Sequence, residues 1–300
     1  MKNILVTGSH RSGTTWVGKT IAQHSNVQYI QEPFNVNHPN AGFKFKSEVW
    51  FEHYFSSERK DEIKFAFDSM FGAGSLGKAQ LRISDVKSAP KSLFLFLAHY
   101  INCLTHPMRL LVKDPLALFS AGWLYEEYDL DVICMIRSPV AFVGSLKKAG
   151  WDFDFDNLLK QELLMKNLLT PFSDDIRKQK EGHGDIVDRA SLLWNILHYA
   201  ILEYKQQYPS WLFVKYEDIA GNPVKGFDEI FDHLGLDVDR NITAYIKKFT
   251  SQDIPIKRSS SLYSPRDSKL CLDTWKQRLT NEEIDRVNCY TKDIASQLYD

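Results

Sequence analysis

The chain has 300 residues, and its 37 basic and 38 acidic side chains leave a formal net charge of −1. A nucleic-acid coat or a broad surface for anionic membranes needs an excess of positive charge, so this balance argues against both. A local anion site needs only a few well-placed donors and is compatible with the balance. We therefore expect no nucleic-acid partner.

The apolar stretches and the cysteines indicate the compartment. No apolar stretch approaches the roughly 20 residues of a membrane-spanning helix, and the apolar run at the N-terminus is too short for a signal peptide. The cysteines form no C-x-x-C pair, which favours reduced thiols over disulfides or a metal site. They are Cys103, Cys134, Cys271 and Cys289. We expect a cytoplasmic protein without a transmembrane segment; its oligomeric state cannot be read from the sequence.

Short apolar strands alternate with helical segments along the chain. The run NILVT at residues 3–7 is stopped by Gly8 and predicts a buried first strand. A second short strand is expected at residues 27–30. Helices are expected over residues 14–24, 47–71 and 89–104.

The rest of the chain continues this alternation. Ser138 and Pro139 suit an N-cap followed by proline at the first helical position, so a helix should run to about Lys148. Thr280 and Glu283 fit a capping box at the start of a closing helix. The other expected strands cover residues 109–113, 131–136 and 211–215. The other expected helices lie near residues 116–126, 156–169 and 186–207, with two shorter ones after the last strand and the closing helix over 280–298.

This order of elements predicts an α/β fold with three layers, α/β/α, around a central, mostly parallel sheet. The length is compatible with a single domain over residues 1–300. Helical or lid elaborations are expected near residues 40–105 and 150–185, and a basic loop near residues 251–274. The aromatic-rich stretch 43–71 either lines a pocket or lid or packs as a plain helical core.

Residues 8–15, GSHRSGTT, stand between a predicted strand and a predicted helix and have the G-x-x-x-x-G-x-[ST] spacing of a P-loop. Backbone N–H groups and a helix N-terminus bind phosphate in such a loop, and glycines allow its tight turn. Nucleoside triphosphatases carry a lysine after the second glycine, where this chain has Thr14. The nearest cation is Arg11. A loop without this lysine is poorly built for ATP hydrolysis and suits a 5′-phosphate that bears a smaller group.

The segment RSGTTW at residues 11–16 resembles the 5′-phosphosulfate loop of sulfotransferases that use 3′-phosphoadenosine 5′-phosphosulfate (PAPS). Trp16 matches a tryptophan that lies beside the adenine in cytosolic members, and a core position on the first helix explains it equally well. The resemblance implies that the 5′-phosphosulfate is held by Arg11, Ser12, Gly13, Thr14 and Thr15.

A second motif, RSPVAFVGS at residues 137–145, directly follows a predicted strand. It resembles the 3′-phosphate motif of the same family, with Arg137 as a bidentate donor and Ser145 as a hydroxyl donor. The 3′-phosphate distinguishes PAPS from ATP, so these residues would determine donor specificity. Both motifs follow predicted parallel strands, at the edge where α/β sheets bind ligands.

Two further segments support the resemblance. VKYEDIAGNP at residues 214–223 resembles a segment after a late strand in many sulfotransferases, and a capped turn that closes a core strand is its alternative meaning. The loop 257–269 lies where the family has a basic loop over the 3′-phosphate, although it lacks the R-K-G sequence of cytosolic members. From this loop the resemblance implies Arg258 and Arg266 as donor contacts.

Sulfonate transfer needs a base for the acceptor hydroxyl and positive charge at the leaving phosphate. Arg11 supplies such charge, and Lys113 resembles the strand-end lysine near the sulfonate in cytosolic members, with a surface ion pair to Asp114 as the alternative. The histidine base of cytosolic members has no counterpart, because its position is Pro115. Glu32 in QEPFN resembles the glutamate base of carbohydrate-type members. Asp114 is the second candidate for the base.

The resemblance thus implies a PAPS-dependent sulfotransferase that releases adenosine 3′,5′-bisphosphate. Its acceptor would be a small molecule, a carbohydrate or a glycolipid. No residues have the spacing of metal ligands, and no metal is expected. One alternative is a P-loop kinase or nucleotidase, which needs a lysine at position 14 and an acidic Mg²⁺ ligand at a strand end. The other is a non-catalytic nucleotide-binding protein, favoured if Glu32 and Lys113 pointed away from the sulfonate.

Overall fold

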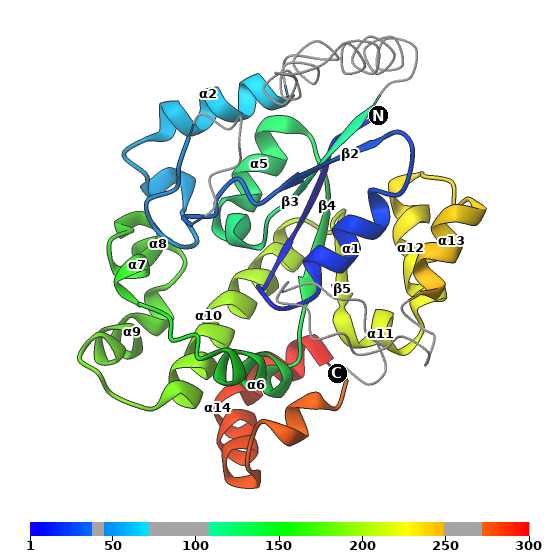
Figure 1. Ribbon diagram of the computed structural model, residues 1–300. Helices are drawn as coiled ribbons and strands as arrows, with labels where there is room; N and C mark the ends of the chain where they lie inside the picture. Colours follow the sequence, from blue (N-terminus) through cyan, green and yellow to red (C-terminus); the bar gives the residue numbers. More distant parts are fainter. Residues whose placement is uncertain (38–44, 72–107, 249–271, 300) are drawn as a thin grey trace, which may run out of the picture.

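The computed structural model describes four stretches of the chain, residues 1–37, 45–71, 108–248 and 272–299. Within them five strands form one parallel sheet in the order β2-β3-β1-β4-β5 (Figure 1). The strands are β1 (Ile4–Gly8), β2 (Val27–Gln31), β3 (Arg109–Lys113), β4 (Asp131–Ile136) and β5 (Leu212–Lys215). Each lies within one residue of its expected position, so the predicted parallel sheet is confirmed.

Helices cover both faces of this sheet, which confirms the three-layer α/β/α architecture (Figure 1). One face carries α2 (Lys60–Phe71), α5 (Ala121–Tyr128), α6 (Pro139–Ala149), α10 (Ile186–Gln207) and α14 (Asn281–Tyr299). The other face carries α1 (Thr14–Ile21), α11 (Tyr216–Gly221), α12 (Pro223–Leu234) and α13 (Arg240–Lys247). Three short helices lie between α6 and α10, namely α7 (Asp156–Leu159), α8 (Glu162–Asn167) and α9 (Ser173–Lys180).

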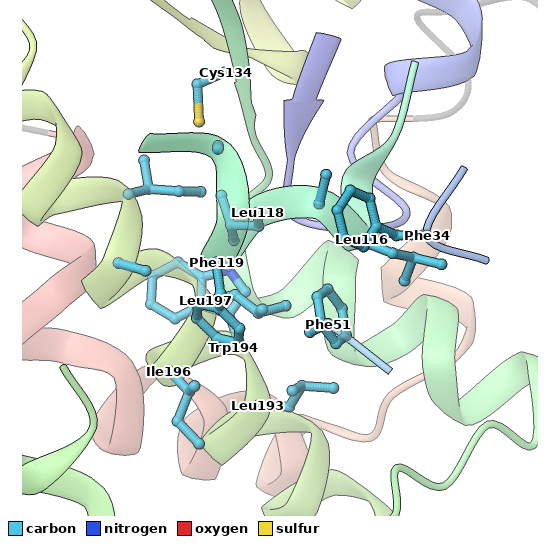
Figure 2. Packing of buried hydrophobic residues seen from close by; sticks show 14 of the residues in the cluster. Phe34, Phe51, Leu116, Leu118, Phe119, Cys134, Leu193, Trp194, Ile196 and Leu197 are labelled. Atoms are coloured by element: carbon cyan, nitrogen blue, oxygen red, sulfur yellow. The ribbon is translucent and has the colours of Figure 1, made fainter. Parts of the chain in front are cut away.

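The three central strands, β1, β3 and β4, are buried on both faces, which is why they read as nearly continuous apolar runs. In β1, Leu5 belongs to the core cluster under α6 and α10, while Ile4 and Val6 belong to the cluster under α1 and α12. Figure 2 shows the first cluster, where Phe51 and Phe119 lie near residues of α10. Full burial of such side chains contributes about 1.5–3 kcal/mol each.

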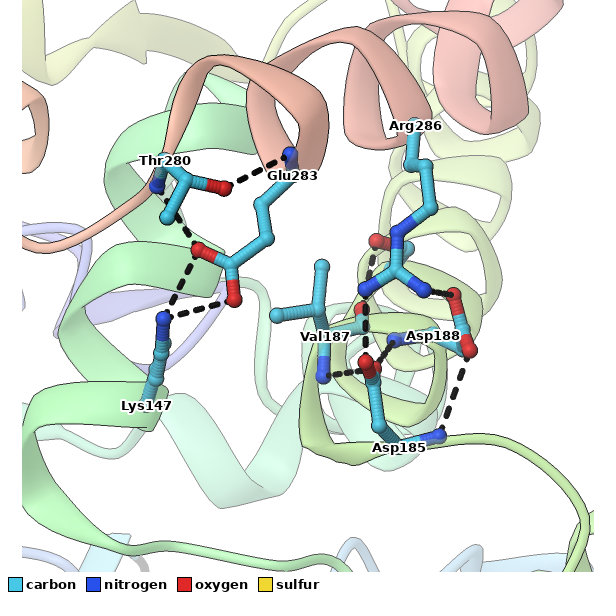
Figure 3. A network of polar contacts seen from close by, with 8 residues as sticks. Lys147, Asp185, Val187, Asp188, Thr280, Glu283 and Arg286 are labelled. Atoms are coloured by element: carbon cyan, nitrogen blue, oxygen red, sulfur yellow. Dashed lines mark hydrogen bonds and ion pairs between the residues drawn. The ribbon is translucent and has the colours of Figure 1, made fainter.

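The C-terminal helix α14 is fastened to α6 and α10 by charged groups (Figure 3). Thr280 and Glu283 form the predicted capping box. Glu283 also accepts hydrogen bonds from Lys147 Nζ of α6 at 2.6 and 2.7 Å. Arg286 donates to Asp185, which caps α10, at 2.6 Å. These contacts hold α14 against α6 and α10 within this helical layer.

Two predicted helices are interrupted by long-range hydrogen bonds. The expected helix 47–71 is helical only in α2 and in a 3₁₀ turn over Tyr54–Ser56. Before that turn, His53 N donates to the side chain of Gln161 at 2.6 Å. The expected helix 156–169 breaks at this same Gln161, whose backbone is non-helical and whose buried side chain also donates to Phe51 O at 3.2 Å. On both segments, hydrogen bonds of the Gln161 side chain therefore take the place of helical backbone hydrogen bonds.

Other expectations have mixed outcomes. Pro139 does begin α6, but the side chain of Ser138 makes no capping bond, so that part of the prediction is wrong. In the described stretch that ends at residue 248, three helices follow β5, namely α11, α12 and α13, where two were expected. The expected helix 89–104 and nearly all of the basic loop 251–274 lie outside the described residues. In the described stretches, no helix is both long and apolar enough to cross a bilayer.

Candidate active site

The loop after β1 is shaped by two glycines. Gly8 has φ +120°, and a Cβ there would lie 2.2 Å from the carbonyl oxygen of Met135 on β4, so only glycine fits. The next residue, Ser9, donates its N–H to that carbonyl at 3.1 Å. Gly13 has φ +88°, and a Cβ there would lie 2.6 Å from the ring of Tyr216. The loop is thus tied closely to β4 and to the start of α11.

The loop leads into an uncapped helix N-terminus. Gly13 is the N-cap of α1, so no side chain caps the helix, and its first turn carries no acidic residue. Such an end presents N–H groups and a positive partial charge to an anion. Within the loop, Ser12 Oγ donates to Ser9 O, and Arg11 has the sparsely populated φ of +64°. These features suit the predicted phosphate-binding role.

The structure brings the two sequence motifs into contact. Arg11 Nε in the loop after β1 donates to Ser145 Oγ on α6 at 2.9 Å. β1 and β4 are neighbouring strands, but the helices that follow them, α1 and α6, cover opposite faces of the sheet. The connections after these two strands therefore turn away from each other at the carboxyl edge of the sheet. Ligands of α/β proteins bind at such switch points.

Arg137, directly after β4, is nearly buried, with 8% of its surface exposed. Its guanidinium carbon lies 3.8 Å from the ring centroid of Tyr216, and its Nε lies 3.5 Å from Glu217 Oε1. That Nε is buried without a hydrogen-bond partner among the described residues. The same Glu217 accepts from Ser138 N at 3.1 Å and from Tyr299 Oη at 3.1 Å. The Arg137 guanidinium is therefore held in a fixed orientation, and its Nε–H can still donate a hydrogen bond to a ligand.

Glu32 and Lys113 meet where β2 and β3 end. Lys113 is fully buried, and its Nζ forms an ion pair with Glu32 Oε1, whose side chain is 20% exposed. Glu32 N donates to Lys113 O at 2.8 Å, and Asn35 Nδ2 donates to Glu32 Oε2 at 2.6 Å. Glu32 adopts the left-handed φ of +45°, an unfavourable conformation for a side chain of this kind. The carboxylate is held firmly at the edge of the sheet that carries the phosphate loop.

Asp114 is fully buried and serves as an anchor. Its Oδ2 accepts from Phe34 N at 2.6 Å, and its Oδ1 accepts from Leu116 N at 2.9 Å. It thereby fixes the chain two residues beyond Glu32. Burial raises the pKa of the Asp114 carboxyl to about 7. The suggested surface ion pair of Lys113 with Asp114 is wrong, because both side chains are buried and Lys113 pairs with Glu32.

Trp16 packs inside the second core cluster. It is 6% exposed, with its ring edge-on to Tyr216 and to Phe227 at centroid distances of 6.1 and 5.2 Å. The core role is therefore seen directly, while a contact with adenine stays a prediction. The predicted donor contacts Arg258 and Arg266 lie outside the described residues.

An aromatic group beside the phosphate loop was missed by sequence reasoning. Trp151, just after α6, is 45% exposed, and its ring centroid lies 5.4 Å from the guanidinium carbon of Arg11. The ring of His10 lies 6.2 Å from Trp151 and 4.8 Å from Phe142. Burial lowers the pKa of His10 to about 3, so its ring is neutral. No local pattern around Trp151 marks it as part of a site.

Within the described stretches, no group of three or more His, Cys, Asp or Glu side chains is arranged to hold a metal ion. The side chains gathered at this edge are instead cations, hydroxyls and two carboxylates, Glu32 and Glu217, each paired with a cation. Arg11 and Arg137 are suited to phosphate or sulfate oxygens. The donor set thus fits an anionic ligand.

Comparisons with known proteins agree with this geometry. A family model described as the sulfotransferase family matches residues 3–240. Carbohydrate sulfotransferase 1 from Mus musculus is 30% identical over 95 residues, which cover 30% of this chain and 23% of that protein. The Danio rerio protein of the same name is 26% identical over 97 residues, which cover 31% of this chain and 22% of that protein. The match therefore spans less than a quarter of the length of these relatives.

A solved structure shares the fold. The sulfotransferase domain from the curacin biosynthetic pathway has a TM-score of 0.50 and 15% sequence identity, with 99% of this chain and 97% of that chain covered. At this identity the likeness concerns the fold alone. It agrees with the parallel sheet and the helical layers described above.

Replacing Asp114 by asparagine should remove a pH dependence from the stability of the protein. The pKa of about 7 in the folded chain lies above the ordinary value of 3.8. Between these values the folded state keeps a proton that the unfolded state has lost. The free energy of unfolding of the native protein should therefore fall as pH rises, by up to about 1.4 kcal/mol per pH unit. Urea denaturation between about pH 5 and pH 8 measures this slope.

The asparagine variant is its own control, because every other titrating group is shared with the native protein. The difference in free energy of unfolding between the two proteins should change steadily across the window. A constant difference would mean that Asp114 is ionised throughout.

Proposed function

The chain belongs to the sulfotransferase family, and we propose that it transfers a sulfonate group from PAPS to an acceptor hydroxyl. The products are adenosine 3′,5′-bisphosphate and a sulfate ester. The 5′-phosphosulfate is bound by Arg11, Ser12, Gly13, Thr14 and Thr15. The 3′-phosphate is bound by Arg137 and Ser145.

One observation supports this proposal most strongly. The hydrogen bond from Arg11 Nε to Ser145 Oγ, 2.9 Å long, joins the loop assigned to the 5′-phosphosulfate to the helix assigned to the 3′-phosphate. PAPS carries its 5′-phosphosulfate and its 3′-phosphate on the same ribose. The loop and the helix that bind these two groups must therefore belong to a single site. The uncapped start of α1 suits the first anion, and the orphaned Nε of Arg137 suits the second.

The two alternatives have less support. A kinase or nucleotidase needs a lysine where this chain has Thr14, and an acidic Mg²⁺ ligand where β4 is followed by Arg137. A non-catalytic binder has no need for a carboxylate at the reacting end. Glu32 and Lys113 lie paired at the same edge of the sheet as the phosphate loop, which favours an enzyme.

Glu32 is the proposed general base. The acceptor oxygen bonds to sulfur, its proton passes to the Glu32 carboxylate, and the bond from sulfur to the bridging phosphate oxygen breaks with its electron pair leaving on the phosphate. Arg11 and the start of α1 stabilise the charge that develops there. Lys113 holds Glu32 in position and adds buried positive charge. Asp114 is not assigned this role, because its side chain is fully buried, whereas the side chain of Glu32 is 20% exposed.

The acceptor class we propose is a carbohydrate hydroxyl. Two relatives bear the name carbohydrate sulfotransferase 1. The exposed indole of Trp151 beside Arg11 offers a flat apolar face next to the reacting groups, where a sugar ring can stack. A glycolipid or another small alcohol is the alternative acceptor. The cytoplasmic location stays a prediction from the sequence.

Replacing Arg137 by alanine should remove discrimination for the 3′-phosphate. Calorimetric titration compares adenosine 3′,5′-bisphosphate with adenosine 5′-monophosphate, which lacks only that phosphate, and with ATP. We expect the native protein to prefer the bisphosphate over both. In the variant, bisphosphate affinity should fall about 10- to 100-fold, the loss for a charged hydrogen bond, while monophosphate affinity stays within about twofold.

Arg177→Ala is the matched control, since Arg177 is an exposed arginine on α9 with only a surface partner. It should leave all three affinities unchanged. Preference of the native protein for ATP, or equal bisphosphate affinity in Arg137→Ala, would contradict the proposed donor.

Replacing Glu32 by glutamine should abolish turnover while preserving donor binding. Transfer of ³⁵S from labelled PAPS is measured against a panel of oligosaccharides and small alcohols, and the variant is then assayed with the acceptor that the native protein uses. We expect kcat to fall about 10²- to 10⁴-fold, because proton removal is lost. Affinity for adenosine 3′,5′-bisphosphate should stay within about threefold.

The control here is Glu48→Gln, which neutralises an exposed carboxylate paired with Arg59. It should retain native kcat. A Glu32→Gln variant that keeps turnover close to native would exclude Glu32 as the base and leave Asp114 as the other candidate.

A further inference from the structure

The backbone of Arg137 lies where regular hydrogen bonding ends. β4 stops at Ile136, whose sheet partner is Lys215, and α6 begins at Pro139. The N–H and the carbonyl of Arg137 therefore belong to neither element, in a residue that is only 8% exposed. Buried backbone groups without partners are strongly unfavourable. Their partners must come from elsewhere in the fold.

Two side chains of α10 provide these partners. Trp194 Nε1 donates to Arg137 O at 2.8 Å, and Arg137 N donates to His198 Nε2 at 3.4 Å. Trp194 and His198 are four residues apart on one helix face, with ring centroids 4.1 Å apart and an interplanar angle of 18°. Both are fully buried. Trp194 and His198 thus bind both backbone polar groups of Arg137, its carbonyl oxygen and its N–H.

The protonation state of His198 is determined by its contacts. Its Nδ1 lies 2.8 Å from Trp194 O, so this nitrogen carries the hydrogen and Nε2 presents its lone pair to Arg137. Burial lowers the pKa of His198 to about 3, so the ring stays neutral near neutral pH. The Nε2 atom of His198 therefore remains a hydrogen-bond acceptor near neutral pH.

We propose that Trp194 and His198 are positioning residues that hold the backbone of Arg137 so that its guanidinium meets the 3′-phosphate of the donor. This inference rests on the proposed function and deepens it. The side chain of Arg137 is held by Tyr216 and Glu217, which follow β5. Its main chain is held by α10, from the other helical layer. An arginine fixed at both ends loses less conformational freedom when it binds phosphate.

The surroundings of the pair support a specific role. Figure 2 shows Trp194 among apolar core residues, near Leu193 and Leu197. In such a cluster an apolar ring would fill the same space without needing a hydrogen-bond partner. The polar atoms of Trp194 and His198 are satisfied through the backbone of Arg137 and of α10 itself.

The test compares Trp194→Phe and His198→Phe with the native protein by calorimetric titration. Each substitution keeps an aromatic ring and removes one bond to Arg137. Affinity for adenosine 3′,5′-bisphosphate should fall about 3- to 30-fold, and affinity for adenosine 5′-monophosphate should stay within about twofold. The control Ile196→Ala removes a buried side chain of α10 that makes no bond to Arg137. It should lower the melting temperature but keep the ratio of the two affinities.

A double-mutant cycle separates positioning from general stability. In the Arg137→Ala background, Trp194→Phe should cause no further loss of bisphosphate affinity. Full additivity of the two losses, or an unchanged ratio in both phenylalanine variants, would overturn the inference and leave the proposed function standing. A native protein that does not distinguish the two nucleotides would instead overturn the proposed donor, and the inference with it.

Discussion

The parallel pairing of β1 with β4 determines where the site lies. In this register Gly8 is opposite Met135, so the loop after β1 and the chain after β4 leave the sheet side by side. Their helices then pack on opposite faces. No other residue fits so close to the Met135 carbonyl, so this arrangement requires glycine at position 8. The Arg11–Ser145 hydrogen bond is its direct consequence.

The charged groups of the site are paired across elements. Lys113 of β3 pairs with Glu32 beyond β2, and Arg137 beyond β4 faces Glu217 of α11. Loss of one partner from such a buried pair leaves an uncompensated charge, which is strongly destabilising. The pairing therefore keeps the cations oriented before any substrate arrives. Oriented charge of this kind is the main contribution that a protein makes to phosphoryl and sulfonyl chemistry.

Sequence reasoning succeeded where the signal is local. Apolar runs predicted all five strands, and the glycine spacing predicted the tight turn between β1 and α1. The family resemblance supplied Glu32 and Arg137. Reasoning failed where one distant side chain decides the outcome, as at Gln161, which interrupts two expected helices. The contacts of His198 and the exposure of Trp151 likewise depend on the packed fold and leave no local pattern.

A crystal structure of the complex with adenosine 3′,5′-bisphosphate would show directly whether the two motifs bind one nucleotide. We predict that the 5′-phosphate lies against the amides of residues 12–15 at the start of α1. The 3′-phosphate should contact the Arg137 guanidinium and the Ser145 hydroxyl. A nucleotide bound elsewhere, or one whose 3′-phosphate points away from Arg137, would contradict it.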